Sequence, residues 1–512
     1  MLAKITSCSV LGIDGWLIQV EVDVTAGLPV FSTVGLPDSI VRESKDRVKA
    51  AIKNCGYNFP AQKITVNLAP ADIRKEGAGF DLPIAIGILE ATEVFQRKRE
   101  GRFCIVGELS LDGGVHKVNG LLPMILAAKS EALCGIIVPK ENIDEAQIIP
   151  KGIDIIPVSS LQQAIEYLAG LEVTAPICAS TLSEVTRRIP NGVDFSDIKG
   201  QQHVIRALEI AAAGGHNILL TGPPGSGKTM LARRFPTILP EMSLDEVLET
   251  TRIYSVAGKV SEKNLLSTIR PFRAPHHTIS DAGLIGGGSI PQPGEVSLAH
   301  NGILFLDELP EFKKHVLEVL RQPIEDGEVT IARANMTLSF PARFTLIAAM
   351  NPCPCGFLGD SRNRCNCTER EIKRYTSKIS GPLLDRIDLH LEVAALNYQE
   401  MSEKAKGEGS EDIKIRVDLA RIIQKQRFIQ EPGVYCNSQM SGKLVEKYCL
   451  LDRKSSVLLE KSVSRLGLSA RAYHRILKMA RTVADMSDSS SIQQLHMAEA
   501  VQFCRTTHQL GN

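Results

Sequence analysis

The chain has 512 residues, of which 44% are apolar and 23% are charged, and its formal net charge is +1. This length predicts two or three domains, because a single hydrophobic core seldom serves more than ~250–300 residues. The composition excludes a disordered chain, and the balanced charge means that any nucleic-acid-binding surface has to be local.

Neither a membrane span nor an export signal is evident in the sequence. No apolar run approaches the ~18 residues that a transmembrane helix needs. The first residues lack the basic start and long apolar stretch of a signal peptide. Twelve cysteines without an export signal favour a reducing compartment and free thiols. We therefore expect a cytoplasmic protein with no membrane contact.

Residues 1–168 alternate strand-like and helix-like segments, which predicts an α/β domain. Short runs rich in β-branched residues lie at 16–22, 64–68 and 135–139, and residues 82–94 have a helical pattern. Residues 169–193 mix Thr, Ser, Pro and Arg without periodicity, which predicts a linker.

A second α/β region is predicted over residues 194–393, followed by a helical region over 394–512. Strand signals disappear after residue 398, and amphipathic helices are expected at 413–430 and 457–486. The predicted order is therefore an α/β domain, a linker, a second α/β domain and a helical cap.

A glycine-rich loop follows the short apolar strand expected at 217–221 and indicates a nucleotide site. The loop and the start of the next helix comprise Gly222, Pro223, Pro224, Gly225, Ser226, Gly227, Lys228 and Thr229. Its glycines let main-chain N–H groups close on phosphate oxygens, and the helix adds its positive N-terminal end. Lys228 can reach the β- and γ-phosphates of ATP, and Thr229 can offer a hydroxyl to Mg²⁺.

The second half of the site argues against the alternative, a chance match in a glycine-rich turn. The apolar run 302–306 is typical of a central parallel strand and ends at Asp307 and Glu308. Asp307 can hold Mg²⁺ through water, and Glu308 can polarise the attacking water. The run 344–350 ends at Asn351, a polar residue that can orient this water. The sequence therefore predicts an ATP hydrolase.

Two arginines are candidates for contacting the γ-phosphate. In a ring ATPase one arginine reaches the neighbour's γ-phosphate, and another links the helical cap to the nucleotide of its own chain. Arg386, within 382–388, suits the first role, and Arg471, on a C-terminal helix, suits the second. A surface salt bridge is the alternative for either residue.

Four cysteines fall in two closely spaced pairs just after Asn351: Cys353, Cys355, Cys365 and Cys367. Four thiolates suit tetrahedral Zn²⁺, which would fix this loop. The one-residue gap within each pair departs from the two-residue gap of zinc ribbons. Reduced, unligated thiols in a mobile loop are the alternative.

With these motifs in hand, residues 194–512 resemble magnesium-chelatase-type AAA+ ATPases, and the whole chain resembles the bacterial ComM (YifB) family. The matching segments are 197–203, 272–278, 302–312 and 350–356. The resemblance implies a homo-hexameric, ATP-driven DNA helicase that binds single-stranded and branched DNA. It also implies branch migration and DNA integration during natural transformation (competence) and recombination, where recombination proteins are candidate partners.

The resemblance also implies a helical lid and two insertions in the AAA+ core. One is expected at 272–299, and the other is a hairpin at 328–340 before the Asn351 strand. In a ring both insertions can point into the central channel, where Arg333 and the pair His276 and His277 would contact DNA phosphates. Alternatively the hairpin packs on the sheet with Arg333 solvated, and the histidines serve packing.

Residues 104–142 resemble the proteolytic domain of Lon, which has a ribosomal S5 domain 2-like α/β fold. Lon chemistry needs a serine nucleophile activated by a lysine. Leu122 stands where the family carries its lysine, and residues 75–81 contain no hydroxyl where it carries its serine. Neither Ser110 nor Lys117 occupies an expected position. The domain is therefore expected to keep the fold without the reaction, and to guide DNA or stabilise a ring.

Two other function classes remain open at this point. The AAA+ part also resembles the magnesium-chelatase motor subunit, but that subunit lacks a Lon-like N-terminal domain. An ATP-dependent protease or a related chaperone is the other alternative, which the missing serine and lysine disfavour. Stimulation of ATP hydrolysis by single-stranded DNA would distinguish the DNA motor from both.

Overall fold

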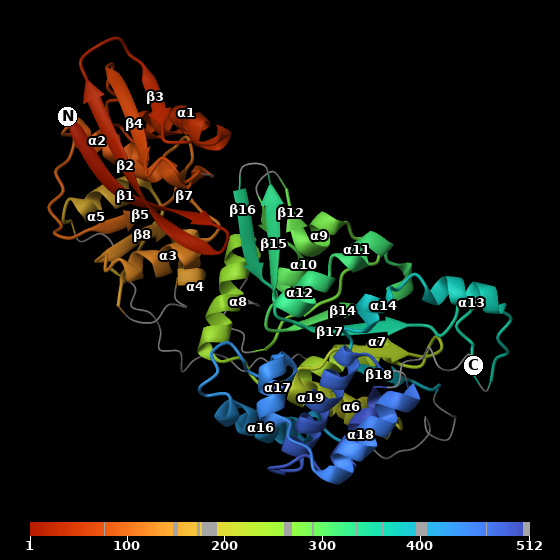
Figure 1. Cartoon of the computed structure of the whole chain (residues 1–512). Coiled ribbons are helices and arrows are strands. Elements are labelled where there is room, and N and C mark those ends of the chain that lie inside the picture. The colour runs from red at the N-terminus through yellow and green to blue at the C-terminus, as the bar shows by residue number, and fades with distance from the viewer. Residues whose placement is uncertain are drawn as a thin grey trace. The chain divides into compact units, whose positions relative to one another are not determined.

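The computed structural model describes residues 1–75, 77–146, 152–171, 175–176, 192–260, 269–288, 291–333, 336–360, 362–395, 407–466 and 468–504. Most of the linker expected at 169–193 and the expected hairpin tip at 334–335 lie outside these residues. The chain forms two compact units, Met1–Thr186 with Val247–Ser267 and Arg187–Glu246 with Thr268–Asn512 (Figure 1).

The first unit is built on a seven-stranded sheet in the order β3-β4-β2-β1-β5-β8-β9. The strands are β1 Leu2–Leu11, β2 Asp14–Thr25, β3 Phe31–Val34, β4 Lys63–Ala69, β5 Phe103–Ile105, β8 Gly135–Pro139 and β9 Asp154–Val158. Strand β2 pairs antiparallel with β1 and β4, and the other neighbours pair parallel. Every second residue of β2 from Ile18 to Val24 is buried, the period expected of a strand with one face on a core.

Helices cover both faces of this sheet, so the unit has two hydrophobic clusters. One cluster contains Ile5 and Ile18 beneath α1 and α2, and the other contains Cys8 and Cys104 beneath α3. The remaining elements of the unit are α1 Ser39–Asn54, α2 Asp81–Ala91, β6 Glu108–Leu109, β7 Val115–His116, α3 Leu121–Ser130, α4 Ile143–Ala146 and α5 Leu161–Leu168.

Helix α8, Leu244–Val256, joins the first unit although it lies within the range 194–393 expected for the second α/β domain. Its Ser255 hydroxyl donates to Glu145, and the Ser255 carbonyl accepts the Gly120 N–H at 3.0 Å. Arg252 forms an ion pair with Asp14. Polar and charged contacts of this kind are hard to predict from a helical pattern, because their partners are more than 100 residues away.

The second unit contains a five-stranded parallel sheet in the order β11-β14-β17-β10-β18. The strands are β10 Ile218–Thr221, β11 Phe272–Arg273, β14 Ile303–Leu306, β17 Thr345–Met350 and β18 Leu389–Glu392, and the flanking helices are α6 Gln202–Gly214 and α7 Lys228–Arg234. All residues of β10 and β14 are buried, as expected of central parallel strands covered on both faces. The predicted α/β fold class is confirmed.

Two additional structures lie between the strands of this sheet. Residues 281–298 form α9 Asp281–Ile285, β12 Gly286–Gly287, β13 Gln292–Pro293 and α10 Glu295–Leu298. Before β17 the chain forms α11 Lys314–Glu318, α12 Arg321–Asp326 and an antiparallel hairpin of β15 Glu328–Arg333 and β16 Met336–Pro341.

The C-terminal part is helical and packs on the sheet through one continuous core (Figure 1). After the short α13 Glu369–Thr376 and α14 Gly381–Leu384, its helices are α16 Ser410–Arg427, α17 Gly442–Tyr448, α18 Arg453–Leu466, α19 Ala470–Met486 and α20 Gln494–Phe503. The continuous helix expected at 457–486 is wrong: Ser469 caps α19 by accepting the Ala472 N–H at 3.2 Å, so a second helix starts there. Each helix in the described ranges is too short or too polar to cross a bilayer.

Candidate nucleotide site

The glycine-rich loop follows β10 at the carboxyl edge of the parallel sheet. Gly222 lies so close to the next strand's end that a Cβ there would stand 2.2 Å from the Val393 carbonyl oxygen, which excludes any side chain. Gly225 and Gly227 have φ angles of 76° and 93°, values that favour glycine. The loop therefore has the backbone freedom that a phosphate cradle requires.

Lys228, the first residue of α7, has its Nζ surrounded by three oxygen acceptors. It donates to the carbonyls of Gly222 at 2.7 Å and Pro223 at 2.8 Å, and to Asn351 Oδ1 at 3.2 Å. Burial lowers the pKa of Lys228, and the nearby Asp307 carboxylate counteracts this. An ammonium held among neutral oxygens at the centre of the loop suits an anionic phosphate group.

Thr229 and Asp307 meet at the adjacent position. The Thr229 hydroxyl donates to Asp307 Oδ2 at 2.7 Å, which joins the first turn of α7 to the end of β14. A hydroxyl and a carboxylate are the hard oxygen donors that Mg²⁺ prefers, and Mg²⁺ bound to ATP keeps several waters. These two side chains would therefore hold a magnesium ion, which would supply positive charge beside the phosphates of ATP.

Glu308 is held away from ordinary backbone geometry, with a φ of 51°. Its carboxylate is 59% exposed and lies 3.3 Å from His277 Nδ1. His277 in turn stacks against His276, with ring centroids 4.1 Å apart. Of the histidine pair expected to contact DNA, His277 thus faces the candidate catalytic carboxylate. The sequence contains a signal for this contact between His277 and Glu308. The histidine pair follows β11, which lies beside β14, and Glu308 follows β14.

The four cysteines after Asn351 converge on one point. The sulfur atoms of Cys353, Cys355, Cys365 and Cys367 all lie within 4.8 Å of one another. Cys353 is 3.3 Å from Cys355 and 3.7 Å from Cys365, and Cys355 is 3.6 Å from Cys365. A tetrahedral Zn²⁺ with Zn–S bonds of ~2.3 Å separates its sulfurs by ~3.8 Å. The cluster therefore fits zinc in ligand type, number and spacing.

This cysteine loop also touches the phosphate loop. A Cβ on Gly356, whose φ is 86°, would lie 2.6 Å from the ring of Pro224 and 3.8 Å from the Asn351 side chain. The cysteine loop thus packs against Pro224 of the phosphate loop. It also follows Asn351 directly in the sequence.

Comparison with known proteins gives the family. Residues 194–401 match the model "Magnesium chelatase, subunit ChlI", 20–142 match "Subunit ChlI of Mg-chelatase", and 407–504 match "Magnesium chelatase, subunit ChlI C-terminal". The chain is 44% identical to Competence protein ComM of Haemophilus influenzae, over 98% of this chain and 97% of that protein. It is 43% identical to the uncharacterized protein YifB of Escherichia coli, over 96% and 95% of the two chains. The chain belongs to the ComM (YifB) family of magnesium-chelatase-type AAA+ ATPases.

A third relative bears on the N-terminal unit. Lon protease 2 of Bacillus subtilis is 25% identical over 63% of this chain and 65% of its own length. In the present chain, Leu122 is buried in α3. The Ser110 hydroxyl donates a hydrogen bond to the Gly114 carbonyl oxygen at 3.2 Å. Lys117 is exposed, whereas Lys75 is buried and donates to the Pro70 carbonyl. Burial lowers the pKa of Lys75.

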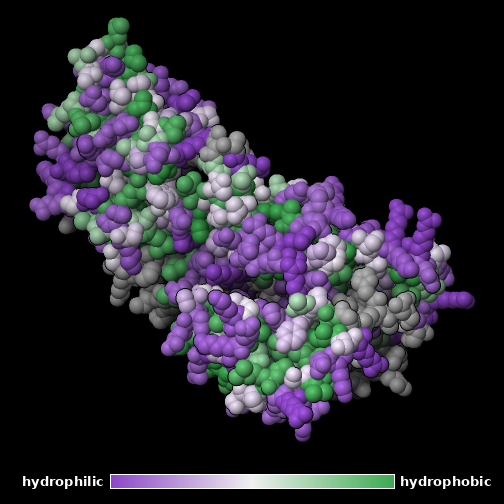
Figure 2. All heavy atoms as spheres, viewed as in Figure 1, coloured by the Kyte–Doolittle hydropathy of each residue, from purple (hydrophilic) through white to green (hydrophobic). Residues whose placement is uncertain are grey.

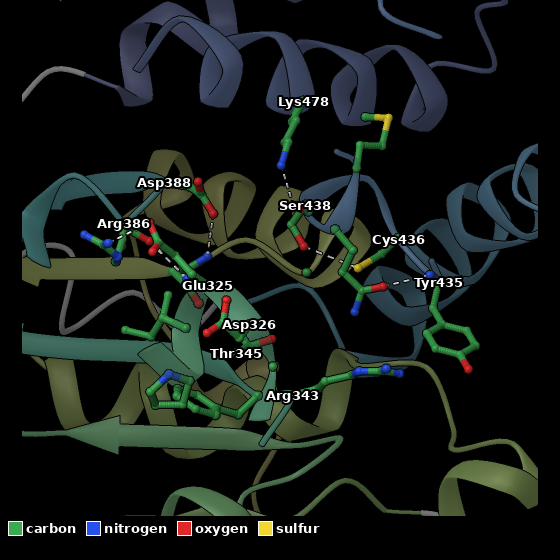
Figure 3. Close-up of a pocket in the computed structure, with 18 of the residues that line it drawn as sticks. Glu325, Asp326, Arg343, Thr345, Arg386, Asp388, Tyr435, Cys436, Ser438 and Lys478 are labelled. Atoms are coloured by element: carbon green, nitrogen blue, oxygen red, sulfur yellow. Dashed lines mark hydrogen bonds and ion pairs between the residues drawn. The ribbon is translucent and has the colours of Figure 1, made fainter. Parts of the chain in front are cut away.

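Arg386 and Arg471 meet on one carboxylate that the sequence did not indicate, that of Glu325. Arg386 Nη2 lies 2.6 Å from Glu325 Oε1 (Figure 3), and Arg471 Nη2 lies 3.3 Å from the same oxygen atom. They line a cavity of about 650 Å³ together with Asn217 and Thr345. These two residues lie at the start of β10 and β17, so the arginines occupy the amino edge of the sheet, opposite the phosphate loop.

The hairpin β15–β16 packs against the short β12–β13 hairpin of the other insertion. The Arg333 guanidinium lies beside Gly287, at 3.1 Å from the position of a Cβ there, and Ile331 contacts Gly286 in the same way. Arg333 itself is exposed. Figure 2 shows mostly hydrophilic residues over these strands. The two insertions thus form one polar projection of the ATPase unit.

Proposed function

We propose that this chain is an ATP-driven DNA motor, a ring-forming helicase that promotes branch migration during natural transformation and recombination. The observation that carries the proposal is the separation of the nucleotide site into two halves. The phosphate loop, Asp307 and Asn351 lie at the carboxyl edge of the sheet, and Arg386 and Arg471 lie at the amino edge.

Arginines at the amino edge cannot complete their own nucleotide site, because even a four-residue strand separates the two edges by ~13 Å. A head-to-tail ring joins two different surfaces of neighbouring subunits, and here we infer that the amino edge of one subunit faces the carboxyl edge of the next. We therefore assign both arginines to the neighbour's γ-phosphate, including Arg471, which the sequence pattern alone assigned to its own chain. A homo-hexamer is the arrangement we expect.

The name of one relative supports DNA as the substrate of the motor. The protein from Haemophilus influenzae is named a competence protein, and competence is the uptake of DNA. The N-terminal unit supports DNA guidance or ring stability better than proteolysis, since Leu122 replaces the lysine of the Lon dyad.

Changing Lys228 to Ala tests the motor. Without the ammonium that anchors the phosphates, ATP hydrolysis and ATP-dependent branch migration of a three-strand junction should both fall to background. The measurement is product formation on the junction over time, with wild type and variant at equal concentration.

The matched control is Lys378→Ala, which removes an exposed lysine paired with Glu311 at 3.3 Å and should leave branch migration unchanged. Equal activity of wild type and Lys228→Ala would eliminate the motor proposal. If only the ATPase is lost and the wild type moves no junction, the ATPase stands and the DNA role fails.

Arg333→Ala tests the DNA contact of the projection. If Arg333 neutralises a phosphate, the variant should bind single-stranded DNA more weakly, and the slope of log affinity against log salt should fall by about one. A salt titration of fluorescence anisotropy measures both quantities. Unchanged affinity and slope would show that Arg333 is merely solvated beside Gly287.

We also propose that the four-cysteine cluster binds one Zn²⁺. The support is the sulfur spacing, the tetrahedral preference of zinc and the free state of these thiols. Zinc bound there would crosslink the loop that lies between Asn351 and Pro224.

A further inference from the structure

A single carboxylate, Glu325, pairs with both arginines assigned to the neighbouring subunit's nucleotide. Its Oε1 receives Arg386 at 2.6 Å and Arg471 at 3.3 Å. The two arginines come from different parts of the chain, one between α14 and β18 and the other from the first turn of α19. Through Glu325, Arg386 of the ATPase core and Arg471 of the helical lid share one carboxylate. Figure 3 shows Arg386 beside Glu325.

Arg386 depends on this contact more than Arg471 does. Its side chain is only 6% exposed, whereas that of Arg471 is 57% exposed. Apart from Glu325, Arg386 donates from Nη1 to the Pro382 carbonyl at 2.5 Å, and its buried Nε has no hydrogen-bond partner among the described residues. A guanidinium withdrawn from water requires an anion, so removing or replacing Glu325 changes where Arg386 can rest.

Glu325 also lies at the base of the polar projection. It occupies the last turn of α12, which ends at Asp326. Gly327 follows with a φ of 70°, and β15 begins at Glu328. The other end of the hairpin returns to the same place, because the Ala342 N–H donates to the Gly327 carbonyl at 2.8 Å. Both strands of the hairpin therefore meet the end of α12 at Gly327, two residues from Glu325.

We infer that Glu325 is a positioning residue, an internal anion that holds Arg386 and Arg471 until a neighbour's γ-phosphate takes its place. A triphosphate carries more charge than one carboxylate and accepts bidentate guanidinium bonds, so it can displace Glu325 once the subunits close. DNA on the projection loosens this restraint by shifting α12. The inference rests on the proposed role of the arginines in trans.

The test is Glu325→Gln in the full-length chain, which keeps the side chain's shape and removes its charge. ATP turnover is measured with and without an oligothymidylate. Without DNA, turnover should rise about fivefold, the factor that corresponds to losing ~1 kcal/mol of a partly exposed ion pair. The ratio of DNA-stimulated to unstimulated turnover should fall by the same factor.

Two further variants make the result specific. Glu318→Gln is the matched control, because it also removes the charge of a glutamate that pairs with an arginine. Glu318, in α11, lies 3.0 Å from Arg321 of α12, and its variant should have the ATP turnover of wild type. Glu325→Asp keeps the charge and should restore most of the DNA stimulation, which a purely structural defect would not. Thermal melting of each variant checks that it folds.

The outcomes separate this inference from the function on which it rests. Wild-type turnover in Arg386→Ala would refute the role of the arginine in trans, whatever Glu325→Gln does. A second result is possible: Arg386→Ala loses ATP turnover, while the turnover of Glu325→Gln equals that of Glu318→Gln or falls below that of wild type. This result would leave the role of the arginine in trans intact. That pair of results would show that Glu325 does not restrain the arginines.

Discussion

Replacement of Glu308 by Gln is expected to lower ATP turnover by about 10²–10⁴-fold, the usual contribution of a general base. Nucleotide binding should remain near that of wild type, because we assign the binding of the phosphates and Mg²⁺ to Lys228, Thr229 and Asp307. At the end of β14, Asp307 accepts a hydrogen bond from Thr229 at 2.7 Å, whereas the Glu308 carboxylate is 59% exposed and lies 3.3 Å from His277. Single-turnover hydrolysis and equilibrium binding of a labelled nucleotide measure the two effects separately.

Glu311→Gln is the matched control for this experiment. Glu311 lies one turn further along the chain and pairs with Lys378 at 3.3 Å on the surface, so its loss should leave turnover within about twofold of wild type. Loss of nucleotide binding in Glu308→Gln would contradict the assignment, since it would place Glu308 among the residues that hold ATP. Turnover equal to that of the control would exclude Glu308 as the base.

Much of the nucleotide site follows from sequence because it is local. The glycine-rich loop, Asp307 and Asn351 each follow a short apolar run, and the parallel strands β10, β14 and β17 bring their carboxyl ends to one edge. The glycine spacing of the loop adds a second constraint that few other structures share. The fold class was predictable because these apolar runs are only four to seven residues long, which is typical of buried parallel strands and too short for a buried helix.

The parts that escaped prediction depend on partners far apart in the chain. Glu325 sits in an unremarkable helical segment, and only the folded chain brings it to Arg386 and Arg471. The place of α8 in the first unit depends similarly on Glu145 and Gly120. A helical pattern reports which face is apolar, but it carries no information about which distant charge that helix meets.

Removal of zinc should damage the ATPase as well as the cysteine loop. Cys355→Ser and Cys367→Ser should each reduce bound zinc from about one equivalent per chain to near zero, because three sulfurs hold the ion far less firmly than four. Turnover should then fall by roughly 10–100-fold, since a displacement of ~1 Å in a catalytic group costs up to ~10²-fold. The affected groups are Asn351, which the loop follows, and Pro224, against which Gly356 packs.

Cys134→Ser is the matched control, because Cys134 is an exposed free thiol of the first unit. It should retain full zinc content and turnover. The readouts are metal analysis of the purified chain, titration of reactive thiols before and after chelation, and limited proteolysis of the cysteine loop. If the wild type contains less than about half an equivalent of zinc per chain and all four thiols titrate freely, the cluster is a set of unligated cysteines. If the wild type holds one zinc but its turnover is unchanged after chelation removes the metal, zinc has no influence on Asn351. The loop would then be held by its own packing against Pro224.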